Sequence, residues 1–153
     1  MLESLKQQIV NEIYEEAKKY ETRYFLTLNA LTRDQISFET NLGKLSHRLN
    51  KYCYGRSYIK RKKRLRILGY IEQGELNLGL HIHLIVMHNN DTKRSFEDIN
   101  TYIRKNWYWL IKARGTSFGN LVDLQLVREI KNVLRYITKT FYSNQREFSP
   151  LYF

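Results

Sequence analysis

Two histidines separated by one apolar residue are the first feature of the sequence that could carry out chemistry. His81 and His83 lie in the stretch Leu80-His81-Ile82-His83-Leu84-Ile85-Val86. Because successive side chains of a β-strand point to opposite faces, both imidazoles are expected on one face and Ile82 in the core. Two imidazoles arranged in this way can share one metal ion. The alternative is two histidines on a partly exposed strand face without a ligand.

A third ligand is required for such a metal centre, and the sequence offers several. The strand expected before the histidines ends at Glu72, and a hairpin can bring this carboxylate alongside them. Gln73 and Glu75 in the following loop, and His88 at the far end of the histidine strand, are alternatives. Hard oxygen ligands beside imidazole suit Mn²⁺ or Mg²⁺ at a phosphodiester. Zinc would be favoured by cysteine ligands, and the only cysteine, Cys53, lies far away in the sequence.

A tyrosine and a lysine one helical turn apart form the second candidate group. They lie in the stretch Tyr136-Ile137-Thr138-Lys139 of an expected helix, in which residues three apart are neighbours. Tyr136 falls at the flank of the apolar stripe, so its ring can contact the sheet while its hydroxyl faces out. The alternative is a boundary aromatic residue beside a solvated lysine. Tyr142, on the other flank, is the weaker candidate because Gln145 and not lysine stands three residues on.

The charge of the chain predicts a polyanionic partner. There are 26 lysines and arginines against 15 acidic residues, a formal charge of +11. Such an excess favours nucleic acid first and an anionic membrane second. The 12 tyrosines and 2 tryptophans favour a single strand, because unpaired bases stack on aromatic rings. One run of cations is expected to contact phosphates, the alternative being a solvated loop. It consists of Lys60, Arg61, Lys62, Lys63, Arg64 and Arg66.

Hydrophobic periodicity predicts the elements that must position these groups. Apolar residues recur at helical spacing in four stretches and alternate or cluster as in strands in four others. Helices are expected at 2–20, 38–53, 95–109 and 128–142, and strands at 24–29, 64–72, 80–87 and 121–126. Ser95 is expected to cap the third helix. The order after the first helix is β-α-β-β-α-β-α, which is typical of a split βαβ, ferredoxin-like layout. We therefore predict an α+β fold with a central antiparallel sheet, helices on one face and an extra N-terminal helix.

Length and composition favour one cytoplasmic domain. A chain of 153 residues suits a single hydrophobic core. We expect an N-terminal helix within 1–21, a catalytic core over 23–142 and a frayed polar tail over 143–153. No apolar run approaches the roughly 20 residues of a membrane span, and the N-terminal stretch lacks the pattern of a signal peptide. A lone cysteine fits a reducing compartment.

Taken together, these motifs resemble those of the HUH endonuclease superfamily, and in particular its rolling-circle replication initiators. Tyr24-Phe25-Leu26-Thr27-Leu28-Asn29 is similar to the first motif of that family. Glu72 followed by His81-Ile82-His83 is similar to the second, the metal-binding motif of histidine, hydrophobic residue and histidine. Tyr136-Ile137-Thr138-Lys139 is similar to the third. The three occur in the family's order and span roughly residues 23–142, so the chain is interpreted as a single HUH nuclease domain.

The resemblance implies a reaction and a role for each site residue. In that family the tyrosine attacks a DNA phosphate, forms a 5′-phosphotyrosine link and frees a 3′-hydroxyl that primes replication. The resemblance thus implies that Tyr136 and Lys139 are catalytic. It also implies that Glu72, His81 and His83 hold Mn²⁺ or Mg²⁺. A single motif tyrosine implies the single-tyrosine branch of the family.

The resemblance also implies partners. The substrate would be the single-stranded DNA of a replication origin, in the host cytoplasm if a plasmid, phage or virus encodes the protein. No G-x-x-x-x-G-K-[ST] run occurs, so a helicase domain is not expected and unwinding would fall to a host helicase acting with a host polymerase. The oligomeric state stays open, with a homodimer among the alternatives.

Other functions fit parts of the pattern. An HUH transposase or relaxase would use the same chemistry on a different DNA. A replication regulator could bind single-stranded nucleic acid without cutting it, and would need neither the metal nor Tyr136. An RNA-binding module would also use a basic sheet, but the glycine and aromatic signature of RNA-recognition modules is absent from the sequence.

Overall fold

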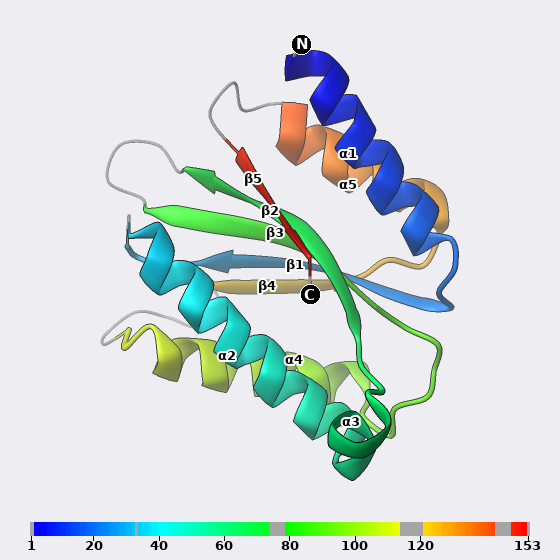
Figure 1. Ribbon diagram of the computed structural model, residues 1–153, viewed down its shortest axis with the longest axis vertical. Helices are drawn as coiled ribbons and strands as arrows, with labels where there is room; N and C mark the ends of the chain where they lie inside the picture. Colours follow the sequence, from blue (N-terminus) through cyan, green and yellow to red (C-terminus); the bar gives the residue numbers. More distant parts are fainter. Residues whose placement is uncertain (1, 33, 74–78, 114–120, 143–147, 153) are drawn as a thin grey trace.

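The computed structural model describes residues 2–32, 34–73, 79–113, 121–142 and 148–152, without the side chains of 2–4, 6, 72–73, 137–142 and 148–152. Figure 1 shows three layers, with a twisted sheet between two groups of helices. The helices are α1 (Leu2–Ala17), α2 (Gln35–Tyr54), α3 (Arg56–Arg61), α4 (Phe96–Leu110) and α5 (Ile130–Tyr142). The strands are β1 (Thr22–Asn29), β2 (Arg66–Gln73), β3 (Leu80–His88), β4 (Val122–Leu126) and β5 (Phe148–Tyr152).

The described strands form one antiparallel sheet in the order β4-β1-β3-β2-β5. Helix α2 connects β1 to β2, and β3 lies between these two strands. Helix α4 connects β3 to β4, and β1 lies between them. These two interleaved units make up the split βαβ arrangement. The predicted α+β, ferredoxin-like fold with an extra N-terminal helix is therefore confirmed.

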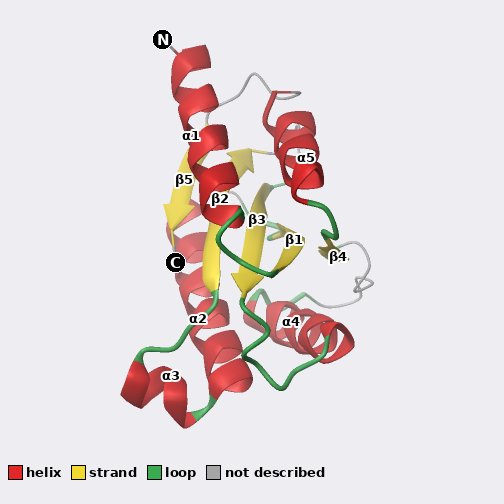
Figure 2. Ribbon diagram, turned by 90° about the vertical axis from the view of Figure 1, so that its right-hand side faces the viewer, coloured by secondary structure: helices red, strands yellow, loops and turns green. Residues whose placement is uncertain are grey.

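The two faces of the sheet carry different helices. Helices α2 and α4 pack on one face, as predicted, and α1 and α5 lie together over the other (Figure 2). Alternate residues of β3 contribute to the hydrophobic cores on the two faces of the sheet. Ile82 and Leu84 belong to the core under α2 and α4, whereas Ile85 and Met87 belong to the core under α1 and α5. The centre of the sheet is buried on both faces because β3 is apolar at most positions.

Local capping explains where the helices over the first face begin and end. Helix α2 begins at Gln35, three residues before the expected start, because the Asp34 carboxylate accepts the backbone N–H groups of Ile36 and Ser37. It ends before Gly55, whose φ of 56° suits glycine. Ser95 caps α4 as predicted, in a capping box with Asp98. These caps fix the ends of both helices relative to the sheet.

Two elements differ from the sequence-based expectation. Helix α3 was not predicted, because six residues are too few to show a helical period and the stretch is dominated by cations. The frayed tail predicted after residue 143 is wrong over Phe148–Tyr152. This segment pairs with β2, from Leu68↔Tyr152 to Glu72↔Phe148. Backbone groups at a sheet edge can pair with any chain whatever its polarity, and an edge strand tolerates Pro150.

Helix α1 ends at Ala17, three residues earlier than expected. Its buried positions follow one stripe that faces the sheet, namely Ile9, Val10, Ile13 and Ala17. Most of the other described side chains of α1 are polar, and Leu5 is an exposed apolar exception. Neither α1 nor any other helix in the described part of the chain has the length and apolar character needed to cross a membrane.

Candidate metal and nucleophile site

The two histidines lie on β3, between β1 and β2 in the sheet. Their ring centroids are 5.4 Å apart and their planes stand at 80° to each other. Ile82 between them is fully buried in the core under α2 and α4. Strand alternation therefore places both imidazoles on the opposite face, the one covered by α1 and α5. The structure thus brings the two rings together as the spacing predicted.

His83 is the more enclosed of the pair, with only 8% of its surface exposed. Its Nδ1 lies 3.2 Å from the Oγ1 of Thr27, the residue directly opposite on β1. The ring stacks on Phe25 with centroids 5.9 Å apart and packs beside Tyr70 at 5.5 Å. A hydrogen bond at one ring nitrogen and aromatic walls on the sides fix the orientation of an imidazole, as happens at metal ligands. His81, nearer the strand start, is more exposed.

Among the carboxylate and amide candidates for the third ligand, backbone register favours Glu72. Glu72 lies directly opposite His81, and opposite positions of an antiparallel pair share a face with Cβ atoms about 5 Å apart. Gln73 lies opposite Leu80 and therefore on the other face. The Glu72 side chain and all of Glu75 lie outside the described residues. Within the described part of the chain, no group of three His, Cys, Asp or Glu residues is placed to hold a metal.

His88 is excluded from the histidine site by its position. It stands at the far end of β3 and on the opposite face, where it is 5% exposed. Its Nε2 lies 3.1 Å from the hydroxyl of Tyr24, and its Nδ1 accepts the backbone N–H of Asn90. Burial lowers the pKa of His88, and the charge of Asp91 partly opposes this. A neutral histidine bonded on both nitrogens is a structural group.

Tyr136 reaches the histidine face from α5. It is half-buried against the core under α1 and α5, and its ring stacks on Phe25 with centroids 4.8 Å apart and planes 16° apart. Phe25 also stacks on His83, so a single aromatic ring links the tyrosine to the histidine pair. Lys139 and Tyr142 follow on the same helix, but their side chains lie outside the described residues. The structure therefore brings Tyr136 and the histidines together from segments more than fifty residues apart in the sequence.

The cationic run from Lys60 to Arg66 lies elsewhere. It covers the end of α3 and the start of β2. β2 then extends from Arg66 to Glu72 before it reaches the histidines, which is about 20 Å at 3.3 Å per residue. The run is therefore at the opposite end of the sheet from His81. If it contacts DNA, it contacts a part of the strand several nucleotides from the histidines.

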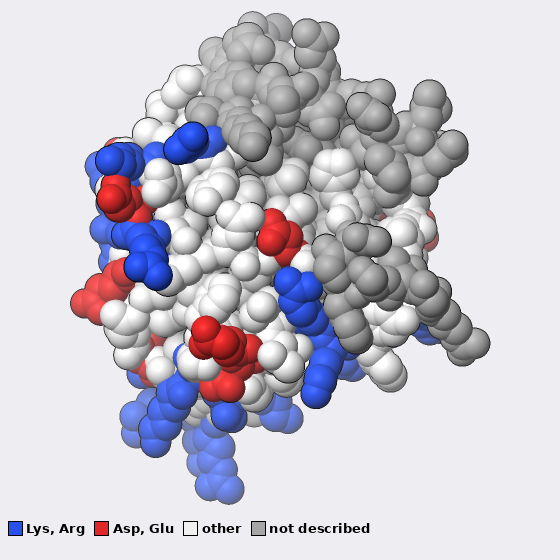
Figure 3. Space-filling model, turned by 180° about the vertical axis from the view of Figure 1, so that it is seen from behind, with Lys and Arg blue, Asp and Glu red and all other residues white. Residues whose placement is uncertain are grey.

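Some members of this run already have partners within the protein. The Nε of Arg66 lies 3.2 Å from a carboxylate oxygen of Glu16, and the Nζ of Lys63 lies 3.5 Å from one of Asp91. Lys60, Arg61 and Lys62 are exposed. A rear view shows lysine and arginine side chains along the left and lower margins and right of the centre of this face, with acidic side chains interspersed among them (Figure 3). Arg64 is exposed as well, but its guanidinium lies over the ring of Tyr58, with the two 5.9 Å apart. Lys60, Arg61 and Lys62 are therefore the residues of the run best placed to contact a phosphate backbone.

Sequence reasoning missed the residues that surround the histidines. Phe25 and Thr27 were noticed only as members of a motif, yet they hold His83 from β1. Their odd numbers place them on one face of β1, which is a signal present in the sequence. Which face of β1 meets which face of β3 depends on the register, and that is a tertiary property.

No protein-family model matches the sequence, and no curated protein or solved structure matches the chain. The resemblance to replication initiators therefore depends on the three short motifs.

Proposed function

We propose that this protein is a metal-dependent endonuclease of the HUH type that nicks and joins single-stranded DNA through Tyr136, in the manner of a rolling-circle replication initiator. One observation carries the proposal. His81, His83, the position of Glu72 and the ring of Tyr136 share one face of one sheet. The net charge of +11 supports a nucleic-acid substrate.

The donor set fits a hard divalent cation. His81 and His83 would supply two nitrogens, and Glu72 would supply a carboxylate from the position opposite His81. Thr27 engages Nδ1 of His83, so the metal would be held through Nε2 of that ring. When bound, Mn²⁺ or Mg²⁺ would polarise the scissile phosphate and offset the negative charge that develops there.

The protein groups would carry out the covalent step. The hydroxyl oxygen of Tyr136 forms a bond to phosphorus as the bond from phosphorus to the 3′-oxygen breaks. The phenolic proton passes to solvent, and the departing 3′-oxygen takes up a proton to become a hydroxyl. Stacking on Phe25 holds the phenol ring in place, and such positioning accounts for much of the rate of a reaction of this kind. Lys139 stands one turn further along α5, where a cation would favour the phenolate.

The product is a DNA strand joined to Tyr136 through its 5′-phosphate, with a free 3′-hydroxyl on the other fragment. Attack of a 3′-hydroxyl on the phosphotyrosine reverses the step, releases the tyrosine and joins the DNA. Cleavage and joining therefore need no external energy source, because each phosphoester bond that breaks is replaced by another.

A covalent-adduct assay tests the proposal. The protein is incubated with Mn²⁺ and a random-sequence single-stranded DNA labelled at the 3′-end, since the tyrosine would retain the 3′ fragment. We expect a labelled band at the mass of protein plus DNA on a denaturing gel. Tyr136→Phe removes only the hydroxyl and should bind DNA normally but give no adduct. Tyr142→Phe, on the same helix, is the matched control and should behave like the wild type.

The same assay separates the main rival functions. The half-buried stack of Tyr136 on Phe25 would also suit a tyrosine that only packs, as in a regulator that binds single-stranded DNA without cutting it. Such a protein would bind the DNA and give no adduct with any metal. A transposase or relaxase would give the adduct, and the sequence of the trapped DNA would distinguish it from a replication initiator.

A further inference from the structure

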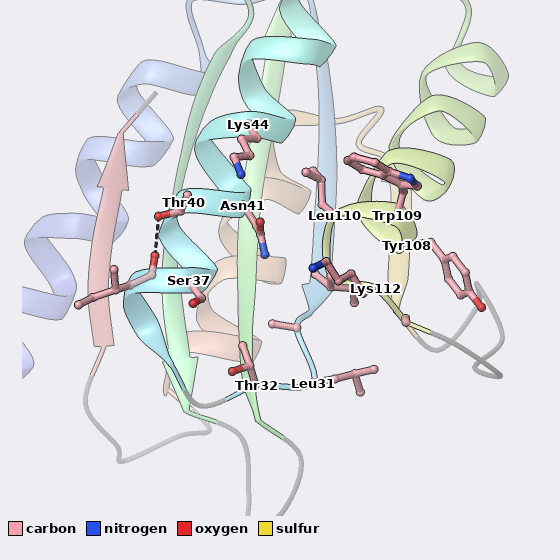
Figure 4. Close-up of a pocket in the computed structure, with 14 residues that line it drawn as sticks. Leu31, Thr32, Ser37, Thr40, Asn41, Lys44, Tyr108, Trp109, Leu110 and Lys112 are labelled. Carbon is pink, nitrogen blue, oxygen red and sulfur yellow. Dashed lines mark hydrogen bonds between the residues drawn. The ribbon is translucent and has the colours of Figure 1, made fainter.

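A groove of about 920 Å³ lies between the first half of α2 and the end of α4, on the face of the sheet opposite the histidines. Its floor is the segment that follows β1, from Ala30 to Thr32 (Figure 4). The volume is within the range of ligand-binding pockets. Nothing in the proposed nuclease mechanism uses it.

Exposed apolar side chains are concentrated at this groove. Leu31 is 55% exposed, Ile36 78% and Trp109 67%, and all three line it. They make up half of the large apolar side chains that are exposed in the described part of the chain; the others, Leu5, Ile59 and Leu126, lie on separate elements. Exposed apolar surface gathered in a concave site is typical of a binding surface.

Trp109 is held in position without being buried. The guanidinium carbon of Arg48 lies 4.8 Å from the centroid of its ring, and Arg48 also donates a hydrogen bond to Asn106. The neighbouring tryptophan, Trp107, differs in every respect. It is fully buried, and its indole N–H donates to the backbone oxygen of Asn29. Trp107 is therefore part of the core. Trp109 instead exposes a large aromatic surface to solvent, and its contact with Arg48 orients the ring.

The charge of the groove is positive. Lys44 from α2 and Lys112 from the segment just after α4 line it, and none of its 14 lining residues is acidic. Lys112 extends toward α2 in Figure 4. Among the described residues, neither ammonium group takes part in an ion pair. An aromatic platform beside two cations suits a strand of unpaired bases joined by phosphates. An apolar peptide would leave both cations without a partner.

The groove lies at the same end of the sheet as the histidines. Its floor is hydrogen-bonded to the residue that precedes His81, since the N–H of Ala30 donates to the oxygen of Leu80 and the N–H of Leu80 to the oxygen of Thr32. A strand leaving the histidine face would pass round this end of the sheet to reach the groove. The cationic run at the other end of the sheet could not serve that part of the strand.

We propose that this groove binds single-stranded DNA, with a base stacked on Trp109 and the flanking phosphates on Lys44 and Lys112. The identity of the ligand as DNA rests on the proposed function. In that function, the groove holds the part of the strand that has passed round the end of the sheet from the histidine face.

The two tryptophans allow a direct test, carried out in the His81→Ala/His83→Ala variant so that binding is measured without cleavage. A mixed-sequence single-stranded oligonucleotide should quench the fluorescence of the exposed Trp109. The quenching should vanish in Trp109→Phe, which retains the buried Trp107. Trp109→Ala should raise the Kd about tenfold, which corresponds to the loss of one stacked base.

The lysines are tested through salt dependence. Lys44→Ala/Lys112→Ala should lower the slope of log affinity against log salt by about 0.7 for each lost contact with a single strand. Lys105→Ala, an exposed cation of α4 that does not line the groove, should leave the slope unchanged. Circular dichroism of each variant checks the fold.

The outcomes distinguish a failure of the groove proposal from a failure of the nuclease proposal. Unchanged DNA affinity in Trp109→Ala, together with normal adduct formation by the wild-type protein, would refute DNA binding by the groove and would leave the proposed function standing. Quenching and weakened binding as expected, with no adduct from the wild type, would support the groove in a protein that is not a nuclease. If the quenching titration gave a lower Kd for RNA of the same sequence than for DNA, DNA would be refuted as the occupant.

Discussion

Thr27 offers the sharpest test of the metal site, because it touches His83 and nothing suggests that it touches the substrate. Its Oγ1 lies 3.2 Å from Nδ1 of His83. Thr27→Val replaces the hydroxyl by a methyl group of similar size and keeps the β-branched shape that a strand prefers. The substitution therefore removes one hydrogen bond and leaves the packing of β1 against β3 nearly intact.

The expected effects are small for the fold and large for the metal. A hydrogen bond of this kind contributes about 1 kcal/mol, so the melting temperature without metal should fall by about 2–4 °C. Loss of a group that orients a ligand weakens metal binding about 10- to 100-fold. At a concentration 100 times the wild-type Kd, Mn²⁺ stabilises the folded state by about 2.7 kcal/mol. A tenfold loss of affinity would reduce that gain to about 1.4 kcal/mol.

Thermal melts with and without Mn²⁺ measure both quantities in one experiment. Thr22→Val is the matched control, since Thr22 lies on the same strand and bonds to Asn90 at the end remote from the histidines. It should lose a similar amount of stability but keep the full gain from Mn²⁺. The reasoning is refuted if Thr27→Val keeps the full metal-dependent gain, or if both variants lose it equally.

Three further predictions concern the scaffold and the surface. Gly69→Ala would place a Cβ 2.0 Å from the backbone oxygen of His83, so we expect chemical denaturation to show a loss of at least about 3 kcal/mol in the free energy of unfolding. Gly43→Ala, with open space around it, should leave the free energy of unfolding unchanged or raise it. Equal behaviour of the two variants would contradict the packing argument. Neutralising the three exposed cations of Lys60–Lys62 should lower the salt slope of DNA binding by about 0.7 per contact, and an unchanged slope would show that this run does not meet the strand. Because burial lowers the pKa of His88, this histidine binds a proton more readily in the unfolded chain than in the folded protein. The contribution of neutral His88 to stability is therefore fully present above about pH 6.5 and is lost as the pH falls below that value. His88→Gln should flatten the decline of the unfolding free energy between pH 6.5 and 5, and a variant with the wild-type pH profile would rule out His88 as its source.

The local pattern of the sequence determined most of the secondary structure and one feature of the site. Alternation in Leu80–Val86 was enough to place both histidines on one face, because a strand has a side-chain period of two whatever surrounds it. The Ser95 cap and the order of the eight predicted elements, from α1 to α5 without α3, followed from similarly local rules. Helix α3 was not predicted, because six residues rich in cations are too few to show a helical periodicity.

Strand pairing could not be deduced from the sequence. The edge strand β5 was predicted as part of a frayed tail, because a five-residue segment that contains a proline carries no signal for the backbone groups that β2 offers at its edge. Register likewise decided between the candidate ligands. It placed Glu72 opposite His81, Gln73 on the other face, and His88 at the far end in a buried hydrogen-bond pair.

Contacts between remote segments were decided by tertiary structure alone. Tyr136 and His83 are joined through Phe25 because α5 packs across the face of β1, and the periodicity of α5 gives only the side it buries, not the ring it meets. Trp107 and Trp109 stand two residues apart with similar local sequence. One is buried and the other exposed because a helix turns about 200° between them, and only the packing of α4 on the sheet decides which of the two faces inward.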